Sequence, residues 1–326
     1  MKHTWKGPAL LAMAMLLLTA CLKDELPVPT HPRGAALEGE ACVGAGYEDQ
    51  VWYDLSGNRI VSSNSKGAWD LAFESAADGW HVRLNGAHFM RANPTGQSDI
   101  TQATDTTGYA PQWRIDRPSG VMDSTAIADW RTDHGVYALD MGYGDIGLPL
   151  PARKLRLIAS DAASFTFEAA MLDGSQVHQY TVQKDPSRRY VHFSLVSGTQ
   201  VDIAPPDGDY DLVFTQFTTQ FFEPFMPYLV TGAVNGFSGI RVAKLDHADF
   251  QAVTLDDTLQ HPFSKREDAI GYDWKVYDFN TSMYTVDPSQ VFIVHDTKGF
   301  FRKLHFVDFY NAQGQRGCPR FEVVTF

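Results

Sequence analysis

The sequence has few cysteines, no run of basic residues and no catalytic motif that identifies an enzyme. Its three cysteines do not form a paired-cysteine metal motif. Acidic side chains outnumber basic ones by 39 to 27, which gives a formal net charge of -12 at pH 7. Because nucleic acids bind clustered positive charge, this balance excludes nucleic acid from the predicted partners.

Motifs of the common enzyme classes are missing as well. The chain has no nucleophile elbow, no zinc-protease helix motif and no phosphate-binding glycine loop. Asp207, Asp209 and Asp211 have the alternate spacing of a calcium loop, but no glycine follows and Thr218 stands where the loop needs a closing glutamate. We therefore interpret these aspartates as a turn that enters a strand, and we predict that the protein is not an enzyme.

The apolar run at residues 9–18 is too short to span a bilayer. It follows Lys2 and Lys6 and leads into small residues that directly precede Cys21. This order is typical of a bacterial lipoprotein signal, so we predict that residues 1–20 are removed and that Cys21 becomes the acylated first residue. Two or more buried acyl chains hold a protein stably on a membrane, so the predicted partner at this end is membrane lipid.

Residues 21–41 combine proline and charge without periodicity, which predicts a tether between the membrane and the fold. Within the tether, Lys23, Asp24 and Glu25 resemble the acidic surface-export signal of lipoproteins in the Bacteroidetes. The predicted location is therefore the outer membrane, with the protein anchored by lipid and facing the cell exterior.

Two segments far apart in the chain are nearly the same. GAWDLAFES at residues 67–75 reappears as GDYDLVFTQ at residues 208–216. A shift of 141 residues, which carries Trp69 onto Tyr210, also aligns the preceding segments without a gap. The match covers turn residues as well as apolar ones: Ser56 with Ser197, Gly57 with Gly198, Gly67 with Gly208, Asp70 with Asp211, Leu71 with Leu212 and Phe73 with Phe214.

This match predicts an internal duplication in which Trp69 and Tyr210 occupy equivalent core positions. A chance likeness between two β-hairpins is the alternative. The predicted first half covers residues 42–160 and the second covers residues 161–326. Whether the two halves form one domain is left open by the sequence.

Short segments rich in β-branched and aromatic residues fill both halves and are separated by Gly, Pro, Asn and Asp. Examples are LRLIAS, SFTFEAAML, YVHFSLV, GIRVAKL and QVFIVHD, and DTKG at residues 296–299 is a hairpin turn between two such segments. The pattern predicts an all-β fold of antiparallel sheets, as a sandwich or a distorted barrel with two structurally related halves.

Several segments share their pattern with one known family: WDLAF at 69–73, HVRLNG at 81–86, TQATDTTGY at 101–109, YLVTGAVNGFSGIRVA at 228–243 and the C-terminal residues 272–317. They resemble the HmuY family of haem-binding surface lipoproteins of Bacteroidetes. The C-terminal pattern is the more specific, with a Trp-containing strand, then VFIV, a turn and a strand that carries lysine and aromatic residues. This chain is longer than the simplest members.

The resemblance implies an outer-membrane surface protein that grips haem, or another small apolar ligand, between two arms of sheet and passes it to an outer-membrane transporter. In such proteins the iron has two axial ligands, paired His or paired Met, and no further metal is implied. The C-terminal ligand would follow the WKVYDF strand, where Phe279 stands with Met283 nearby. The other candidates are Met122, His134, Met141 and Met226.

Three points stay open in the sequence. FFEPFMPY at residues 221–228 is either a binding lip or a loop that covers the sheet. His192 alternates with the apolar residues of its strand, which predicts a side chain that faces solvent. The function that competes with haem capture is that of an accessory or adhesin-like β-sheet lipoprotein, which binds a protein or polymer and lacks haem ligands.

Cys42 and Cys318 are the two thiols that remain once Cys21 carries lipid. An exported protein meets oxidising conditions and two thiols form an even set, which predicts a disulfide between them. Such a bridge would join the start of the fold to its end. Two separate buried thiols are the alternative.

Overall fold

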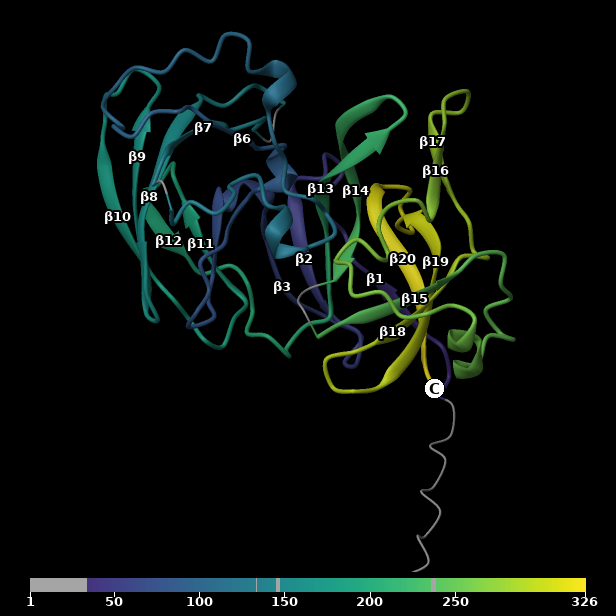
Figure 1. Cartoon of the computed structure of the whole chain (residues 1–326). Coiled ribbons are helices and arrows are strands. Elements are labelled where there is room, and N and C mark those ends of the chain that lie inside the picture. Colours follow the sequence, from purple (N-terminus) through teal and green to yellow (C-terminus); the bar gives the residue numbers. More distant parts are fainter. Residues whose placement is uncertain (1–33, 133, 145–146, 236–238) are drawn as a thin grey trace, which may run out of the picture. The chain divides into compact units, whose positions relative to one another are not determined.

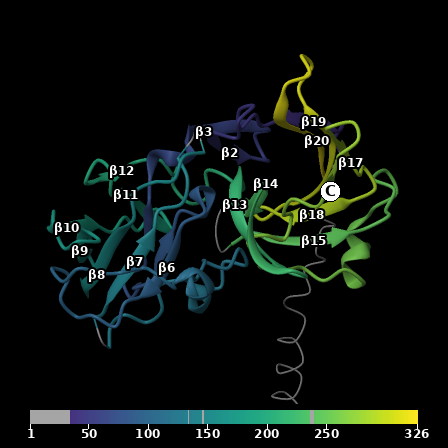
Figure 2. The same cartoon turned by 90° about the horizontal axis from the view of Figure 1, so that it is seen from above.

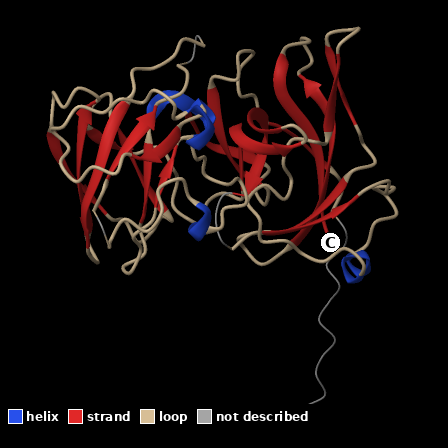
Figure 3. Cartoon of the chain, turned by 45° about the horizontal axis from the view of Figure 1, so that its top comes forward, coloured by secondary structure: helices blue, strands red, loops and turns tan. Residues whose placement is uncertain are grey.

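β-Strands and loops make up the computed structural model of the chain (Figure 1). It describes residues 34–132, 134–144, 147–235 and 239–326. Within these ranges the helices are short 3-10 turns (Figure 3), and none of them is long and apolar enough to cross a membrane. The predicted all-β class with antiparallel sheets is therefore confirmed.

The predicted signal peptide, Cys21 and most of the tether lie outside the described residues. The 3-10 turns are η2 (Lys66–Ala68), η3 (Gly86–His88), η4 (Ala110–Gln112), η5 (Met122–Ser124) and η6 (Leu255–Leu259).

Two five-stranded antiparallel sheets have corresponding strand orders, β10-β9-β8-β7-β6 and β1-β20-β19-β18-β15. Buried Phe165, Phe167 and Ala169 alternate along β9 with less buried residues, as expected for a strand with one face on a core. The strands of the first sheet are β6 (Arg91–Pro94), β7 (Val136–Asp140), β8 (Arg153–Ser160), β9 (Ser164–Met171) and β10 (His178–Gln183). Those of the second are β1 (Leu37–Glu40), β15 (Arg241–Leu245), β18 (Val291–His295), β19 (Phe301–Tyr310) and β20 (Arg316–Thr325).

Two four-stranded sheets also correspond, with the orders β12-β11-β4-β5 and β3-β2-β13-β14. In each of them a hairpin pairs with a strand far away in the sequence, as β2 and β13 do in Figure 2. The strands of the first are β4 (Leu71–Glu74), β5 (Val82–Leu84), β11 (Tyr190–Ser194) and β12 (Thr199–Val201). Those of the second are β2 (Asp49–Asp54), β3 (Arg59–Ser65), β13 (Leu212–Phe222) and β14 (Phe225–Asn235). A separate hairpin consists of β16 (Lys275–Asp278) and β17 (Met283–Val286).

Two large hydrophobic clusters fill the space beneath these sheets. In the first, the ring of Phe73 stacks on Phe167 with centroids 5.1 Å apart. In the second, Phe214 stacks on Phe321 with centroids 5.5 Å apart. Because Phe73 and Phe214 are equivalent in the shift of 141 residues, the repeated segment provides one core aromatic to each cluster.

The hairpins correspond at a slightly different spacing from the one in the gapless alignment. Asp70 Oδ2 accepts a hydrogen bond from Leu195 N at 2.6 Å, and Asp211 Oδ2 accepts one from Leu55 N at 2.8 Å. Leu55 and Leu195 are 140 positions apart, whereas Asp70 and Asp211 are 141 apart. The alignment of Ser56 and Gly57 with Ser197 and Gly198 is therefore wrong by one residue. The segment from Leu55 to Asp70 is one residue shorter than the segment from Leu195 to Asp211.

The same offset explains the turn residues. Asn58 and Gly198, also 140 positions apart, both adopt positive φ angles, of 46° and 68°. Asparagine and glycine tolerate this left-handed conformation better than other residues, so unlike residues serve one turn position. The corresponding strand orders agree with an internal duplication, which stays a prediction.

The predicted division at residue 160 falls inside a hairpin. β8 and β9 pair from Arg153 with Met171 to Ser160 with Phe165. The division therefore does not coincide with the edge of a sheet. The chain from Arg33 to Phe326 forms one unit by its own contacts.

Candidate functional site

Two hairpins extend from the sheets on the same side of the structure, β13–β14 and β16–β17 (Figure 1). We call residues 217–230 and 275–286 the two arms. The first arm is long because β13 and β14 pair without interruption from Leu212 with Asn235 to Phe222 with Phe225. The second arm is shorter and pairs from Lys275 with Val286 to Asp278 with Met283.

The arms share a base. Lys275 Nζ donates a hydrogen bond to the backbone oxygen of Thr231 at 2.5 Å, and thus joins the start of β16 to β14. The ring of Tyr272 lies 6.4 Å from the rings of both Phe217 and Phe221. These contacts fix the origin of both arms.

Lys275 itself is 8% exposed and lies over aromatic rings, with Nζ 4.4 Å from the centroid of Trp274 and 4.9 Å from that of Phe309. Burial lowers the pKa of Lys275 to about 7, because the charged form loses its hydration. The sequence reasoning missed this residue, although its place directly after the tryptophan of the C-terminal motif is a signal that could have drawn attention to it.

Large apolar side chains are exposed at the outer end of each arm. The exposed fractions are 71% for Phe222, 69% for Phe225 and 40% for Met226 on the first arm. On the second arm they are 87% for Phe279 and 51% for Met283. Exposed apolar side chains that cluster in this way are typical of a surface that binds a ligand, a protein or a membrane. FFEPFMPY is therefore the exposed end of a hairpin and does not cover a sheet.

The structure places Met226 and Met283 on the two different arms, so each arm carries one thioether among exposed aromatic rings. The remaining candidates lie elsewhere. Met141 is 2% exposed and belongs to the first hydrophobic cluster, where it fills the core. Met122 Sδ accepts a hydrogen bond from the hydroxyl of Tyr190 at 3.1 Å.

His134 is exposed and follows a short turn near Trp130, whose ring centroid is 5.8 Å away. Its Nδ1 lies 3.3 Å from the backbone oxygen of Leu157 in β8. It therefore belongs to the part of the chain built around the β6–β10 sheet, and the arms contain no histidine.

The structure also joins the two ends of the fold. Cys42 and Cys318 form a disulfide across a sequence separation of 276 residues. Directly before Cys42, β1 pairs with β20 from Leu37 with Val323 to Glu40 with Arg320. The bridge thus holds the N-terminal edge strand against the C-terminal strand that contains Cys318.

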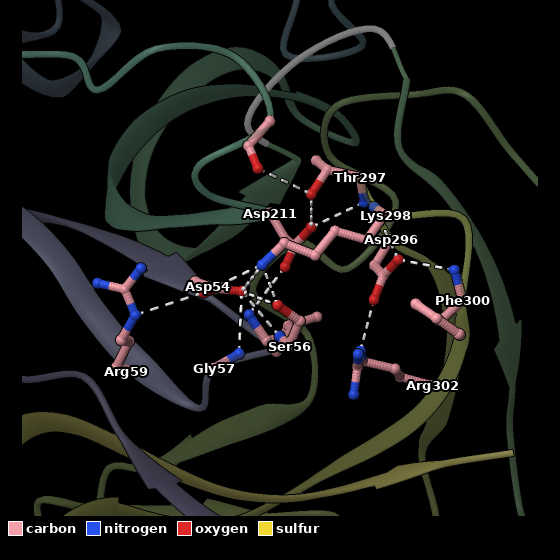
Figure 4. Close-up of polar contacts among 12 residues, drawn as sticks. Asp54, Ser56, Gly57, Arg59, Asp211, Asp296, Thr297, Lys298, Phe300 and Arg302 are labelled. Atoms are coloured by element: carbon pink, nitrogen blue, oxygen red, sulfur yellow. Dashed lines mark hydrogen bonds and ion pairs between the residues drawn. The ribbon is translucent and has the colours of Figure 1, made fainter. Parts of the chain in front are cut away.

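The repeated aspartate belongs to a polar network that holds turns together (Figure 4). Asp211 Oδ1 accepts hydrogen bonds from the backbone and the hydroxyl of Thr297, both at 2.9 Å. Asp296 Oδ2 accepts a hydrogen bond from Arg302 Nε at 2.5 Å. Asp54 accepts hydrogen bonds from the backbone N–H groups of the turn that follows it, and it also forms an ion pair with Lys298. Burial raises the pKa of Asp211, against hydrogen bonds that lower it.

The partners of these carboxylates are backbone N–H groups, hydroxyl groups and cationic side chains, so the role of the network is to fasten the β2–β3 turn and the β18–β19 turn to the start of β13. In the described part of the chain, no three His, Cys, Asp or Glu side chains form a group that could hold a metal ion.

His192 corrects a prediction from the sequence. It was expected to face solvent, but it is 7% exposed. The reason is tertiary: the face of β11 opposite the first cluster packs toward the other four-stranded sheet, and the His192 ring meets Trp69 edge to face at 4.8 Å. Alternation along one strand identifies its two faces but cannot show that both are covered.

The model of the family described as HmuY protein matches residues 46–323. Among solved structures, apo PinO from Porphyromonas gingivitis is similar at 9% identity and a TM-score of 0.31, over 90% of this chain and 98% of that chain. The apo HmuY analogue of Tannerella forsythia is similar at 10% identity and a TM-score of 0.24, over the same shares. No curated protein matches the chain. Since the family model covers most of its length, the chain belongs to the HmuY family, a non-enzymatic family of haem-binding proteins.

Proposed function

We propose that this member of the HmuY family captures haem between its two arms, with Met226 and Met283 as the axial ligands of the iron. The observation that carries the proposal is the arrangement of the arms, which share a base and each expose one methionine among aromatic rings. The haem is cargo, which the protein would pass on to an outer-membrane transporter.

The side chains of the arms fit the chemistry of haem. Haem is a flat apolar disc, so it needs apolar side chains on both faces, and Phe222, Phe225 and Phe279 provide exposed rings. Methionine thioethers are soft ligands that hold haem iron in electron-transfer proteins. Because the two thioethers stand on separate hairpins, a ligand between the arms can be approached by one from each side.

The location that supports this function is the cell surface. We propose that Cys21 carries lipid in the outer membrane, because it follows an apolar run of signal length and small residues. A capture protein of this kind works outside the cell, where its cargo is found.

Titration of haemin into the purified protein, followed by absorption in the Soret region, tests the proposal. We expect a stoichiometric shifted Soret band for the wild type. Met226→Ala and Met283→Ala should each remove one iron ligand, change the band and weaken binding at least tenfold. The matched control is Met122→Ala, because Met122 is a partly exposed methionine outside the arms.

If all three variants had the same spectrum and the same haemin affinity as the wild type, the arm methionines would not be ligands of the iron. A wild type without any Soret shift would contradict haem capture itself and would favour the accessory function, in which the exposed aromatic side chains bind a protein or a polymer.

A further inference from the structure

A cleft lies between the two four-stranded sheets, away from the exposed ends of the arms, and two rows of side chains form its walls. On one sheet Ala72 of β4 pairs with His192 of β11 and with Arg83 of β5. Cross-strand partners point to the same face of a sheet, so these three side chains form one row. All three line the cleft.

The opposite wall is an apolar row built in the same way. Val213 of β13 pairs with Trp52 of β2 and with Val234 of β14, and all three side chains line the cleft. Trp69 and Phe217 also contribute to the lining. An apolar row thus stands against a row that contains an imidazole and a guanidinium group.

The space between the rows has the size of one aromatic ring. It measures about 150 Å3, which is the volume of a cavity that holds benzene. Ala72 makes this space, since the corresponding position of the other sheet carries the larger Val213. The cleft is too small for haem, because sites for ligands of that size measure roughly 300–1,000 Å3.

The polar groups of the cleft include His192 and also Asn235, whose buried Oδ1 has no hydrogen-bond partner among the described residues. The ring of His192 contacts Trp69 edge to face, with the ring centroids 4.8 Å apart. A buried polar atom without a hydrogen bond is unfavourable, so a ligand with one polar group can be held by bonding to the His192 imidazole or by donating to Asn235 Oδ1. Burial keeps the ring neutral, because it lowers the pKa of His192 to about 3.

Arg83, in contrast, already has its counter-charge. Its Nη1 lies 2.7 Å from Glu267 Oε2, and its Nε lies 3.8 Å from Asp116 Oδ2. Glu267 also pairs with Arg189 at 2.6 Å. Two cations and two carboxylates therefore balance, and the cleft offers no free charge to an ionic ligand.

We propose that this cleft binds a neutral single-ring aromatic or heteroaromatic molecule with one hydrogen-bonding substituent. The ring lies between the apolar row and Trp69, and its substituent bonds to His192. The site is separate from haem capture and does not depend on it.

Calorimetric titration of the purified protein with phenol, benzene and benzoate tests the three parts of the proposal. We expect phenol to bind about three- to tenfold more tightly than benzene, which has the shape but no hydrogen-bonding group. Benzoate should bind more weakly than phenol, because the cations of the cleft are already paired. Absence of phenol binding, or tighter binding of benzoate, would overturn the proposal.

Ala72→Leu should fill the space and abolish phenol binding, whereas Ala159→Leu, the same change on an exposed strand position, should leave it unchanged. The circular dichroism spectrum and the cooperative urea unfolding of each variant report that it is folded. If Ala72→Leu fails to fold, His192→Leu and His192→Gln decide the question. His192→Leu should weaken phenol binding about three- to tenfold, and His192→Gln, which keeps a hydrogen-bonding group, should weaken it less. Equal phenol binding by a folded Ala72→Leu variant, or by both His192 variants and the wild type, would show that phenol binds elsewhere.

Discussion

The two four-stranded sheets have corresponding strand orders, but the faces that line the cleft between them differ in polarity. One presents His192, Ala72 and Arg83, and the other presents Trp52 and valines. The edge-to-face aromatic contact is kept in both, at 4.8 Å between Trp69 and His192 and at 4.8 Å between Trp52 and Tyr210. Corresponding backbones can thus keep one packing geometry while one side becomes polar and opens a cleft.

The aspartate within the repeated segment is the clearest common element of the two sheets. Asp70 and Asp211 each accept a hydrogen bond from the backbone of a hairpin that comes from a distant part of the sequence. An unpaired buried N–H group costs about 1–3 kcal/mol, so each carboxylate stabilises a pairing that local sequence cannot encode. The repetition of Asp is therefore explained by structure and not by metal binding.

The largest expected effect separates the two aromatic residues of the repeat. Tyr210→Ala should lower the free energy of unfolding by about 3–5 kcal/mol, because the side chain is 3% exposed and packs against Trp52. Trp69→Ala should cost only about 2 kcal/mol, because its side chain is half-buried and lines the cleft. Urea unfolding of both variants measures the difference, and equal losses would contradict the asymmetry of the two sheets.

A second prediction concerns the edge strands of the five-stranded sheets. The edge strand β1 is followed directly by the Cys42–Cys318 bridge, whereas β10 at the corresponding edge has no disulfide. Replacement of both cysteines by alanine should lower the free energy of unfolding by about 2–4 kcal/mol, since the unfolded chain gains freedom. Reduction of the wild type should have a similar effect in the same urea experiment. A stability unchanged by either treatment would show that β1 is held by its strand pairing alone.

The smallest expected effect is a difference in acid sensitivity between the two rows. Burial lowers the pKa of His192 from 6.5 to about 3, with Arg188 and Arg83 adding to the shift. Because the unfolded state binds the proton first, stability falls as the pH drops below about 6.5, by about 2 kcal/mol between pH 7 and pH 5. His192→Gln should remove this part of the loss. The matched change on the other row, Trp52→Phe, should leave the pH slope as in the wild type. A slope in His192→Gln that is as steep as in the wild type, or steeper, would contradict the account.

Much of the fold could be predicted from the sequence because a strand can be recognised from the pattern of a short stretch of residues. Alternating apolar residues gave the segments around Phe73 and Phe214, and both rings lie in cores. The hairpin turn at residues 296–299 lies between β18 and β19, as its sequence indicates. The register of the repeated hairpins was wrong by one residue, because a one-residue change in a turn leaves the composition of the strand the same.

The candidate site was less accessible to sequence reasoning. The family pattern pointed to Met283, and it left the second ligand open among several residues that included Met122 and Met141. Only the arrangement of the arms distinguishes Met226 from these two methionines. A methionine in a core and one at the end of a hairpin have similar neighbours along the chain. The difference lies in which elements pack over them.

The sequence by itself determined the all-β class, the similarity of the two repeated segments and the resemblance to one family. Strand periodicity and turn residues can be recognised within short stretches of the chain. The tertiary structure alone decided that the β2–β3 hairpin pairs with β13 and the β11–β12 hairpin with β4. That pairing covers the second face of β11, buries His192 and creates the cleft beside Ala72. Burial of this kind depends on which distant strands meet, and no local pattern records it.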